Sequence, residues 1–98
     1  MPIHFRLILQ PLAKATLAKL EQDQPKKHKK VLKTLALMET NLRNPSLQTH
    51  KYNAIQGQNG EEVFESYVEN RTPAAFRVFW HYGPNPQEIT IIAITPHP

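Results

Sequence analysis

Ala75-Phe-Arg-Val-Phe-Trp-His-Tyr82 is a stretch whose side chains divide regularly between two sides. One side carries Phe76, Val78, Trp80 and Tyr82, and the other carries Ala75, Arg77, Phe79 and His81. Alternation with a period of two, in aromatic and β-branched residues, predicts a β-strand in a packed sheet. We therefore expect residues 75–82 to form the central strand of the fold.

Arg77 is the exceptional residue of this strand. A guanidinium in the middle of a packed strand must find a partner or face a cleft, because an unpaired buried charge is costly. Strand-like runs stand on both sides of it in the sequence, at Val63–Val68 and Ile89–Ile94. Together the three stretches predict an antiparallel meander with Arg77 near its centre.

Two helices are predicted in the first half of the chain. Pro11 suits the first turn of a helix over Leu12–Gln22, and Pro25 suits the first turn of a second helix over about Lys26–Leu42. The apolar residues of the second helix recur at helical spacing, at Val31, Leu35, Met38 and Leu42. The two helices form a hairpin, and each has an apolar side that needs a sheet to cover.

The remaining strands complete the predicted fold. A first strand is expected over Ile3–Leu9, a short one over Lys51–Ile55, and a long one over Glu62–Glu69. A last strand over Glu88–Thr95 is nearly continuous in apolar residues, as expected for burial on both faces. The order β–α–α–β–β–β–β predicts one α+β domain over residues 1–98, in which an N-terminal strand and a helical hairpin pack on a mostly antiparallel sheet.

The composition excludes several classes of protein. The 98 residues contain no cysteine, and the five histidines show no metal-ligand spacing, so we expect no disulfide, metal or cofactor. No apolar run approaches the roughly 18 residues of a membrane span, and the N-terminus lacks a signal-peptide layout. The expectation is a soluble, cytoplasmic protein that makes no contact with a membrane.

Charge is distributed unevenly along the chain. The net charge of +4 is the sum of +7 over residues 1–51 and −3 over residues 52–98. Five lysines gather at the start of the second predicted helix, at Lys26, Lys27, Lys29, Lys30 and Lys33. The helix dipole disfavours cations there, so the cluster indicates an anionic partner such as RNA, although a solvated lysine-rich face is the simpler alternative.

Four features together resemble the RelE/ParE toxin superfamily of toxin–antitoxin systems. They are the basic helical hairpin, the Asn44-Pro45 that closes it, the strand core Phe76-Arg77-Val78-Phe79, and His97 after the apolar run Ile91–Ile94. The resemblance covers most of the chain and is to the RelE/YoeB-like branch. It implies a cognate antitoxin partner and a ribosome-dependent endoribonuclease that cuts mRNA without a metal.

The resemblance also implies roles for individual residues. Arg77 would hold the phosphate that the ribose 2′-hydroxyl attacks, and His97 would be the acid for the leaving 5′-oxygen. Glu62 or Glu65 would be the base, and the five lysines would dock on ribosomal RNA. Tyr67, which shares the Glu65 side of its strand, is the candidate for stacking on an RNA base.

Two departures from the family leave other readings open. An acidic strand, Glu61–Glu69, stands where RelE carries a pair of lysines, and the terminal His-Tyr of YoeB-like toxins is His97-Pro98 here. The chain could therefore be an inactive homologue or a ParE-like inhibitor that binds gyrase or another protein. A small basic domain with a protein partner is a third reading. In each of these, Arg77 would pair with Glu62, Glu65 or Glu69.

Overall fold

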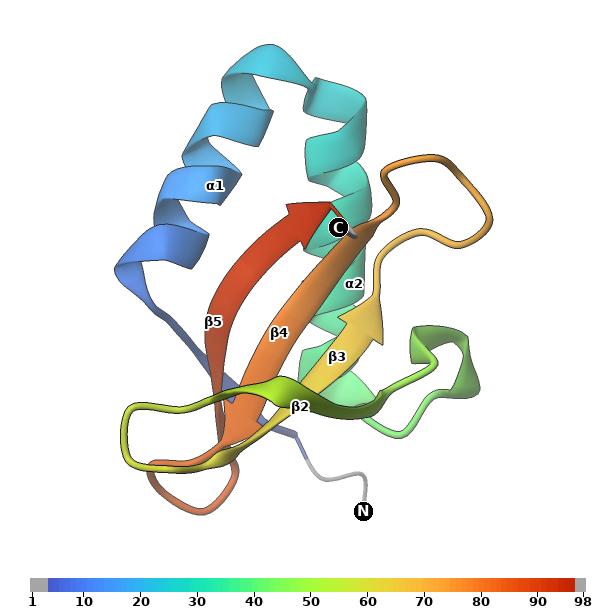
Figure 1. The fold of residues 1–98 in the computed structure, drawn as a ribbon. Helices are drawn as coiled ribbons and strands as arrows, with labels where there is room; N and C mark the ends of the chain where they lie inside the picture. The colour runs from blue at the N-terminus through green and yellow to red at the C-terminus, as the bar shows by residue number, and fades with distance from the viewer. Residues whose placement is uncertain (1–3, 97–98) are drawn as a thin grey trace.

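The computed structural model describes residues 4–96, which form one continuous α+β unit. In chain order the elements are β1 (Arg6–Leu9), α1 (Pro11–Asp23), α2 (Pro25–Thr40), a short 3-10 turn η1 (Pro45–Leu47), β2 (His50–Gln56), β3 (Glu62–Tyr67), β4 (Phe76–Tyr82) and β5 (Glu88–Pro96). The predicted order of strands and helices is therefore confirmed (Figure 1).

The strands form a single twisted sheet. Within residues 4–96 it has five strands, in the order β1-β5-β4-β3-β2. The strand β1 runs parallel to β5, whereas the other three pairs are antiparallel. Arg77 stands opposite Tyr67 of β3 and Thr95 of β5, so the expected meander with this arginine near its centre is confirmed.

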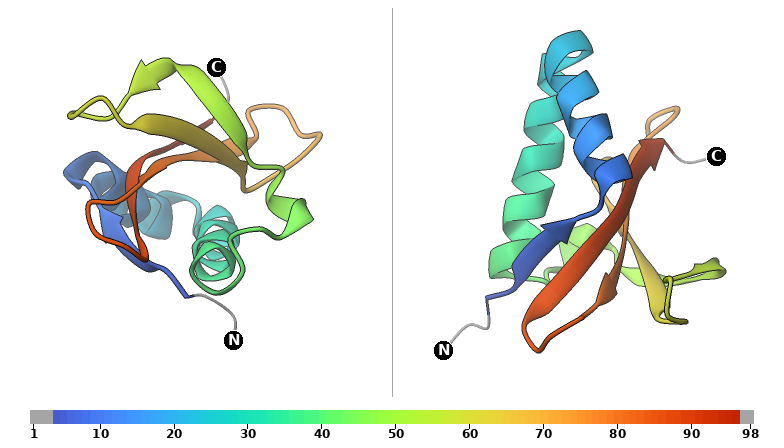
Figure 2. Two further views of the ribbon diagram at one scale, coloured as in Figure 1. Left: turned by 90° about the horizontal axis from the view of Figure 1, so that it is seen from below. Right: turned by 90° about the vertical axis from the view of Figure 1, so that its left-hand side faces the viewer.

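The helical hairpin covers one face of the sheet (Figure 2). Pro11 and Pro25 begin the two helices, where the missing backbone N–H costs no intrahelical hydrogen bond. The second helix ends at Thr40 rather than at Leu42, because Asn41 leaves the helical conformation with φ −153° and ψ 71°. Leu42 is nevertheless buried in the core. No helix in the described part of the chain is long and apolar enough to span a membrane.

The core lies between the helices and this face of the sheet. From the sheet it takes Phe76, Val78, Trp80, Ile89, Ile91 and Ile94, and from the helices Ala13, Leu20, Val31, Leu35 and Met38. The buried indole N–H of Trp80 donates to Ser66 Oγ at 2.8 Å, and Ser66 Oγ lies 2.7 Å from Thr49 Oγ1. Tyr82, which shares the alternation of Trp80, is 51% exposed, because it stands at the end of β4.

The other face of the sheet is covered in part by β2, which curves across it (Figures 1 and 2). The pairing of β2 with β3 is irregular between Lys51 and Gln56. Beneath β2 the ring of Tyr52 packs edge-on against Phe79, with 4.9 Å between ring centroids. Arg77 is on this face, so β2 and β3 decide what surrounds it.

Leu35 and Leu32 allow a matched test of this packing within α2. The side chains are chemically identical, but Leu35 is 5% exposed and Leu32 is 44% exposed. We expect Leu35→Ala to lower the free energy of unfolding by about 2–5 kcal/mol, because it leaves a cavity against the sheet. Leu32→Ala should change it by less than about 0.5 kcal/mol. Urea unfolding of both variants measures the difference, and equal effects would contradict the described orientation of α2.

Candidate active site around Arg77

Arg77 is positioned by the alternation of β4. Phe76 and Val78 on either side of it enter the core beneath the helices, which turns Arg77 to the opposite face. Its side chain is only 10% exposed. A buried guanidinium keeps its charge, so the surrounding residues must supply its contacts.

Glu65 supplies the negative charge beside this guanidinium. Its Oε1 lies 3.4 Å from Arg77 Nη1, and its side chain is 3% exposed. The same Oε1 lies 2.7 Å from His50 Nε2. One carboxylate oxygen on β3 therefore contacts both Arg77 of β4 and His50 of β2. These three residues, with Tyr67, are named here the Arg77 cluster.

Two atoms of this cluster retain hydrogen-bonding capacity. Among the described residues, Glu65 Oε2 and Arg77 Nε are buried and have no hydrogen-bond partner. A buried polar atom without a partner costs about 1–3 kcal/mol, and native proteins contain few of them. The cluster thus holds one acceptor and one donor that are buried and make no hydrogen bond within the described residues.

Tyr67 forms the wall of the cluster. Its ring lies over the Arg77 guanidinium, with 3.7 Å from Arg77 Cζ to the ring centroid, which is a cation–π contact. The His50 ring meets the Tyr67 ring edge-on, with 5.8 Å between centroids. Tyr67 is partly exposed on this side of the sheet, as the sequence pattern predicts. Its stacking on a base stays a prediction.

Of the two other residues proposed for acid–base chemistry, only Glu62 belongs to the residues that the structure describes. Glu62 is exposed and pairs with Lys51 at 2.7 Å, and by the alternation of β3 its side chain is on the opposite face from Glu65. His97 lies outside residues 4–96. Within that range no group of three potential metal ligands is found.

His50 is the member of the cluster that sequence reasoning missed. The predicted strand began at Lys51, which left His50 in a loop. In the structure His50 is the first residue of β2 and stands opposite Glu65 in the register. Asn59-Gly60 lies in the turn between β2 and β3. Counting residues outward from this turn along the two strands does not pair His50 with Glu65, because the register shifts between Lys51 and Gln56.

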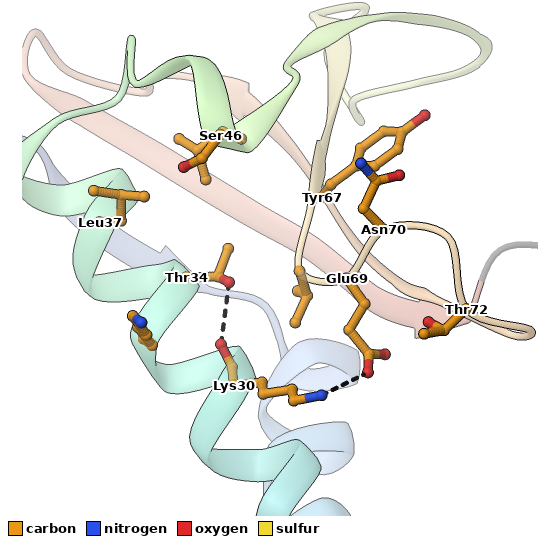
Figure 3. Close-up of a pocket in the computed structure, with 11 residues that line it drawn as sticks. Lys30, Thr34, Leu37, Ser46, Tyr67, Glu69, Asn70 and Thr72 are labelled. Carbon is orange, nitrogen blue, oxygen red and sulfur yellow. Dashed lines mark hydrogen bonds and ion pairs between the residues drawn. The ribbon is translucent and has the colours of Figure 1, made fainter.

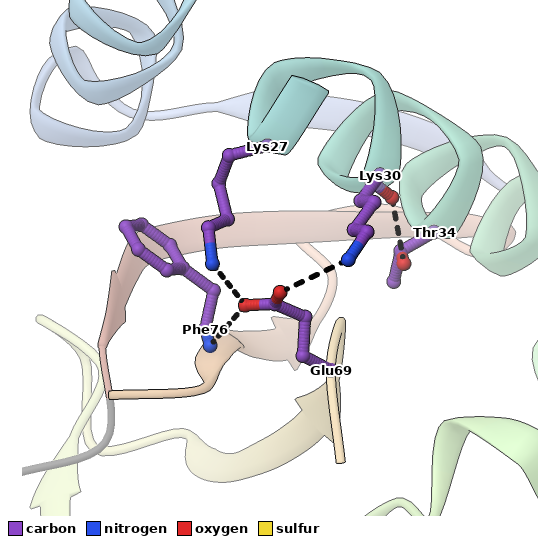
Figure 4. Close-up of polar contacts among 5 residues, drawn as sticks. All are labelled: Lys27, Lys30, Thr34, Glu69 and Phe76. Atoms are coloured by element: carbon purple, nitrogen blue, oxygen red, sulfur yellow. Dashed lines mark hydrogen bonds and ion pairs between the residues drawn. The ribbon is translucent and has the colours of Figure 1, made fainter. Parts of the chain in front are cut away.

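The lysine cluster of α2 is divided by Glu69. Lys27 Nζ lies 2.6 Å from Glu69 Oε1, and Lys30 Nζ lies 3.3 Å from Glu69 Oε2 (Figure 4). The backbone N–H of Phe76 also donates to Glu69 Oε1, at 3.2 Å. The other three lysines of this group are exposed, namely Lys26, Lys29 and Lys33. Two of the five lysines therefore have an anionic partner within the chain.

The carboxyl of Glu69 is ionised by these contacts. Burial alone would raise its pKa, but the hydrogen bonds from Lys27 and from the Phe76 N–H, together with the charge of Lys27, lower the pKa below its ordinary value. Glu69 and its two lysines thus form a charged junction, named here the Glu69 junction, which ties the start of α2 to the loop between β3 and β4.

A groove lies along α2, between the Glu69 junction and Tyr67. It has a volume of about 370 Å³ and runs between α2, η1 and the end of β3 (Figure 3). Lys30 and Lys33 line its helix side, Leu47 and Val68 lie at its apolar part, and Tyr67 stands on the sheet side. Tyr67 thus lines this groove, and its ring lies over the guanidinium of Arg77.

Comparison with known proteins gives structural matches only. No protein-family model matches the sequence, and no curated protein matches it significantly. YoeB from Staphylococcus aureus matches with a TM-score of 0.65 at 16% identity, over 97% of this chain and 99% of that one. A chain of the archaeal RelE–RelB complex from Pyrococcus horikoshii matches with a TM-score of 0.65 at 13% identity, over 95% of this chain and 94% of that one.

A third match is the YoeB/ParE toxin of Agrobacterium tumefaciens, with a TM-score of 0.66 at 10% identity, over 96% of this chain and all of the other. These matches are end to end. The chain has the RelE/ParE toxin fold. The resemblance read from the sequence is thus confirmed at the level of the fold, and in this RelE/ParE fold Arg77 occupies the sheet face that the helices leave uncovered.

Glu69→Gln tests the Glu69 junction, because it removes the charge and keeps the shape. At pH 7 we expect the free energy of unfolding to fall by about 1–3 kcal/mol, since two lysines lose a charged acceptor. The pKa of Glu69 is lowered in the folded protein. Wild type therefore keeps this stabilisation above about pH 4.3, the ordinary carboxyl value, and loses it as the pH falls through the lowered pKa.

The difference between Glu69→Gln and wild type should accordingly shrink in acid, as followed by urea unfolding at several pH values. Glu62→Gln is the matched control, since its exposed pair with Lys51 contributes at most about 1 kcal/mol. A difference for Glu69→Gln that stays constant from neutral pH to about pH 3 would contradict the ionised junction.

Proposed function

We propose that this chain is the toxin of a toxin–antitoxin pair and that it cuts mRNA on the ribosome without a metal. The RelE/ParE fold supports the class of protein. The observation that carries the chemistry is the Arg77 cluster, in which a buried guanidinium is held on the helix-free face with an unpartnered N–H. Arginine is the side chain best suited to hold a phosphate by two parallel hydrogen bonds.

Arg77 acts on the phosphate in this proposal. When the 2′-hydroxyl attacks, negative charge accumulates on the phosphoryl oxygens, and a fixed cation in a poorly hydrated site stabilises that charge more than water does. The Tyr67 ring packs over the guanidinium and holds it in place, so little reorganisation is needed during the reaction. The long 3.4 Å contact with Glu65 is the one that an incoming phosphate replaces.

The proton of the 2′-hydroxyl needs an acceptor. Glu62 and Glu65 are the two candidates, and the geometry favours Glu65, since it is the carboxylate beside Arg77 and its Oε2 has no partner in the described residues. Glu62 is engaged by Lys51. The resemblance assigns the acid to His97, which lies outside the described residues.

Docking on ribosomal RNA is proposed for the exposed lysines of α2. Lys26, Lys29 and Lys33 are exposed, and Lys30, although it contacts Glu69, is 60% exposed and lines the groove beside Tyr67. Cations that follow one side of a helix match the regular spacing of phosphates. Lys27 has a structural part, because it is the most buried member and makes the shortest contact with Glu69.

An antitoxin is the proposed protein partner. Three of the matched structures are complexes, one of RelE–RelB from Pyrococcus horikoshii and two of YoeB–YefM from Staphylococcus aureus. By analogy, an antitoxin segment would cover basic surface of this chain or add a strand to the edge of its sheet. It would neutralise the toxin by closing access to Arg77.

A binding inhibitor without catalysis is the second candidate. It is favoured by Glu65, which already occupies the guanidinium of Arg77 and would make the cluster purely structural. This candidate predicts growth arrest with intact transcripts, whereas the nuclease predicts arrest with cleaved transcripts. Induced expression in a bacterial host, with growth and transcript length followed together, separates them.

Arg77→Ala is the first variant for that experiment. We expect it to abolish arrest and to slow cleavage by at least about 10²-fold, the effect of losing one group that stabilises an oxyanion. Arg77→Lys should restore little, because an ammonium cannot give two parallel hydrogen bonds. Arg6→Ala is the control, since Arg6 is 79% exposed on β1 at the edge of the sheet. Urea unfolding confirms that each variant folds, and wild-type cleavage by folded Arg77→Ala would refute the proposal.

The lysine proposal is tested by salt dependence. We expect Lys29→Ala with Lys33→Ala to weaken ribosome binding and to reduce the slope of log affinity against log salt by about 1 per lysine. Lys19→Ala on α1 is the matched control, because Lys19 is an exposed helical lysine paired with Asp23 at 3.3 Å. Equal slopes for the control, the double variant and wild type would show that these lysines do not contact phosphates.

A further inference from the structure

We propose that His50 is the general acid of the RNA cleavage, and that its Nε2 gives the proton to the leaving 5′-oxygen. The inference rests on the proposed function and deepens it, because the resemblance assigns this step to His97. His50 is the first residue of β2, which curves across the face of the sheet that the helices leave uncovered (Figure 1). Its place is set by the pairing with Glu65.

Both ring nitrogens of His50 lie within hydrogen-bond distance of an oxygen. His50 Nδ1 lies 3.1 Å from the backbone oxygen of Gln48, and Nε2 lies 2.7 Å from Glu65 Oε1. A carbonyl oxygen only accepts hydrogen bonds, so Nδ1 must carry a hydrogen. An ionised carboxylate also only accepts, so the short Nε2 contact needs a second hydrogen.

The two contacts together require one proton more than a neutral imidazole and an ionised carboxylate possess. That proton is shared between His50 Nε2 and Glu65 Oε1, whichever of the two atoms holds it at a given moment. A histidine and a carboxylate in this arrangement form a pair that can release one proton and regain one. This is the property that an acid catalyst needs.

The surroundings of His50 fit that role. Its side chain is 49% exposed, whereas Glu65 is 3% exposed, so a substrate approaching this face reaches the imidazole first. The charged and titratable groups that face it are Glu65 and Tyr67 of β3 and, beyond the shared carboxylate, Arg77 of β4. The proton donor and the proposed phosphate ligand thus contact the same carboxylate oxygen.

The step is balanced within the cluster. The 2′-oxygen forms a bond to phosphorus, the bond from phosphorus to the 5′-oxygen breaks, and the 5′-oxygen keeps the electron pair and takes the His50 Nε2 proton. Glu65 accepts the 2′-hydroxyl proton and returns it to Nε2 along their hydrogen bond. A 2′,3′-cyclic phosphate and a 5′-hydroxyl are formed, and no other reactant is consumed.

The His50 proton reaches the phosphate when Arg77 and His50 exchange their contacts with Glu65 for contacts with the substrate. The Arg77 contact with Glu65, at 3.4 Å, is longer than the roughly 2.7–2.9 Å of a strong charge-assisted bond. A phosphodiester carries the same single negative charge as this carboxylate, and the charge on its oxygens grows as the 2′-oxygen attacks phosphorus. It therefore competes for Arg77, and the half-exposed imidazole turns its Nε2 proton from Glu65 to the leaving oxygen.

A sulfur substitution in the substrate tests the proposal. A 5′-thiolate leaves phosphorus without a proton, so it does not need the acid. Ribosomes are programmed with a short mRNA that carries either oxygen or sulfur at the 5′ position of the mapped cut site. We expect His50→Gln to slow cleavage of the oxygen substrate by about 10²–10⁴-fold. Cleavage of the sulfur substrate should stay within a few-fold of wild type.

Two histidine variants are the controls. His28→Gln, on α2 and outside the Arg77 cluster, should leave both substrates at wild-type rates. Equal loss on both substrates for His50→Gln would show a structural role and overturn the inference, as would rescue by sulfur in His97→Gln instead. A folded wild type that cuts neither substrate on the ribosome would refute the proposed function itself, which distinguishes that failure from the failure of His50.

Discussion

The charge of Arg77 is the constraint on which the helix-free face of the sheet depends. Alternation along β4 sends Phe76 and Val78 into the core and leaves the guanidinium on the other face with 10% of its side chain exposed. The guanidinium contacts the ring of Tyr67 and one oxygen of Glu65, both on β3. His50 of β2 contacts the same Glu65 oxygen, so the groups around Arg77 come from three strands, β2, β3 and β4 itself.

The Glu69 junction is the counterpart on the helix side. It holds the first turns of α2 against the loop that joins β3 to β4, through Lys27, Lys30 and the backbone of Phe76. Cations at a helix N-terminus are unfavourable by themselves, and the buried carboxylate offsets that cost within the chain. Glu69 follows Tyr67 by two residues, so the junction also fixes the backbone from which the wall of the Arg77 cluster projects.

The fold was predictable because its signals are local. Period-two alternation defined β4, and the two prolines with the apolar spacing of α2 defined the hairpin. The partners of the charged residues were harder to predict, since they depend on the register in which neighbouring strands pair. Glu65 was one of three named partners for Arg77, and only the structure selects it. His50 was not found, because the irregular pairing of β2 makes its position opposite Glu65 invisible in the sequence.

The acidic composition of residues 61–69, which include β3, looks unsuitable for an enzyme that holds RNA, since four glutamates in nine residues should repel a polyanion. In the structure each of these glutamates has its own partner. Glu62 pairs with Lys51, Glu65 with His50 and Arg77, and Glu69 with Lys27 and Lys30. Glu61 accepts the backbone N–H of Asn59 in the turn before the strand. Repulsion therefore depends on the net charge of each cluster. In the proposed mechanism His50 and Glu65 share one proton, so the charge of Arg77 is left over and is what would receive the phosphate, although the neighbouring segment is acidic.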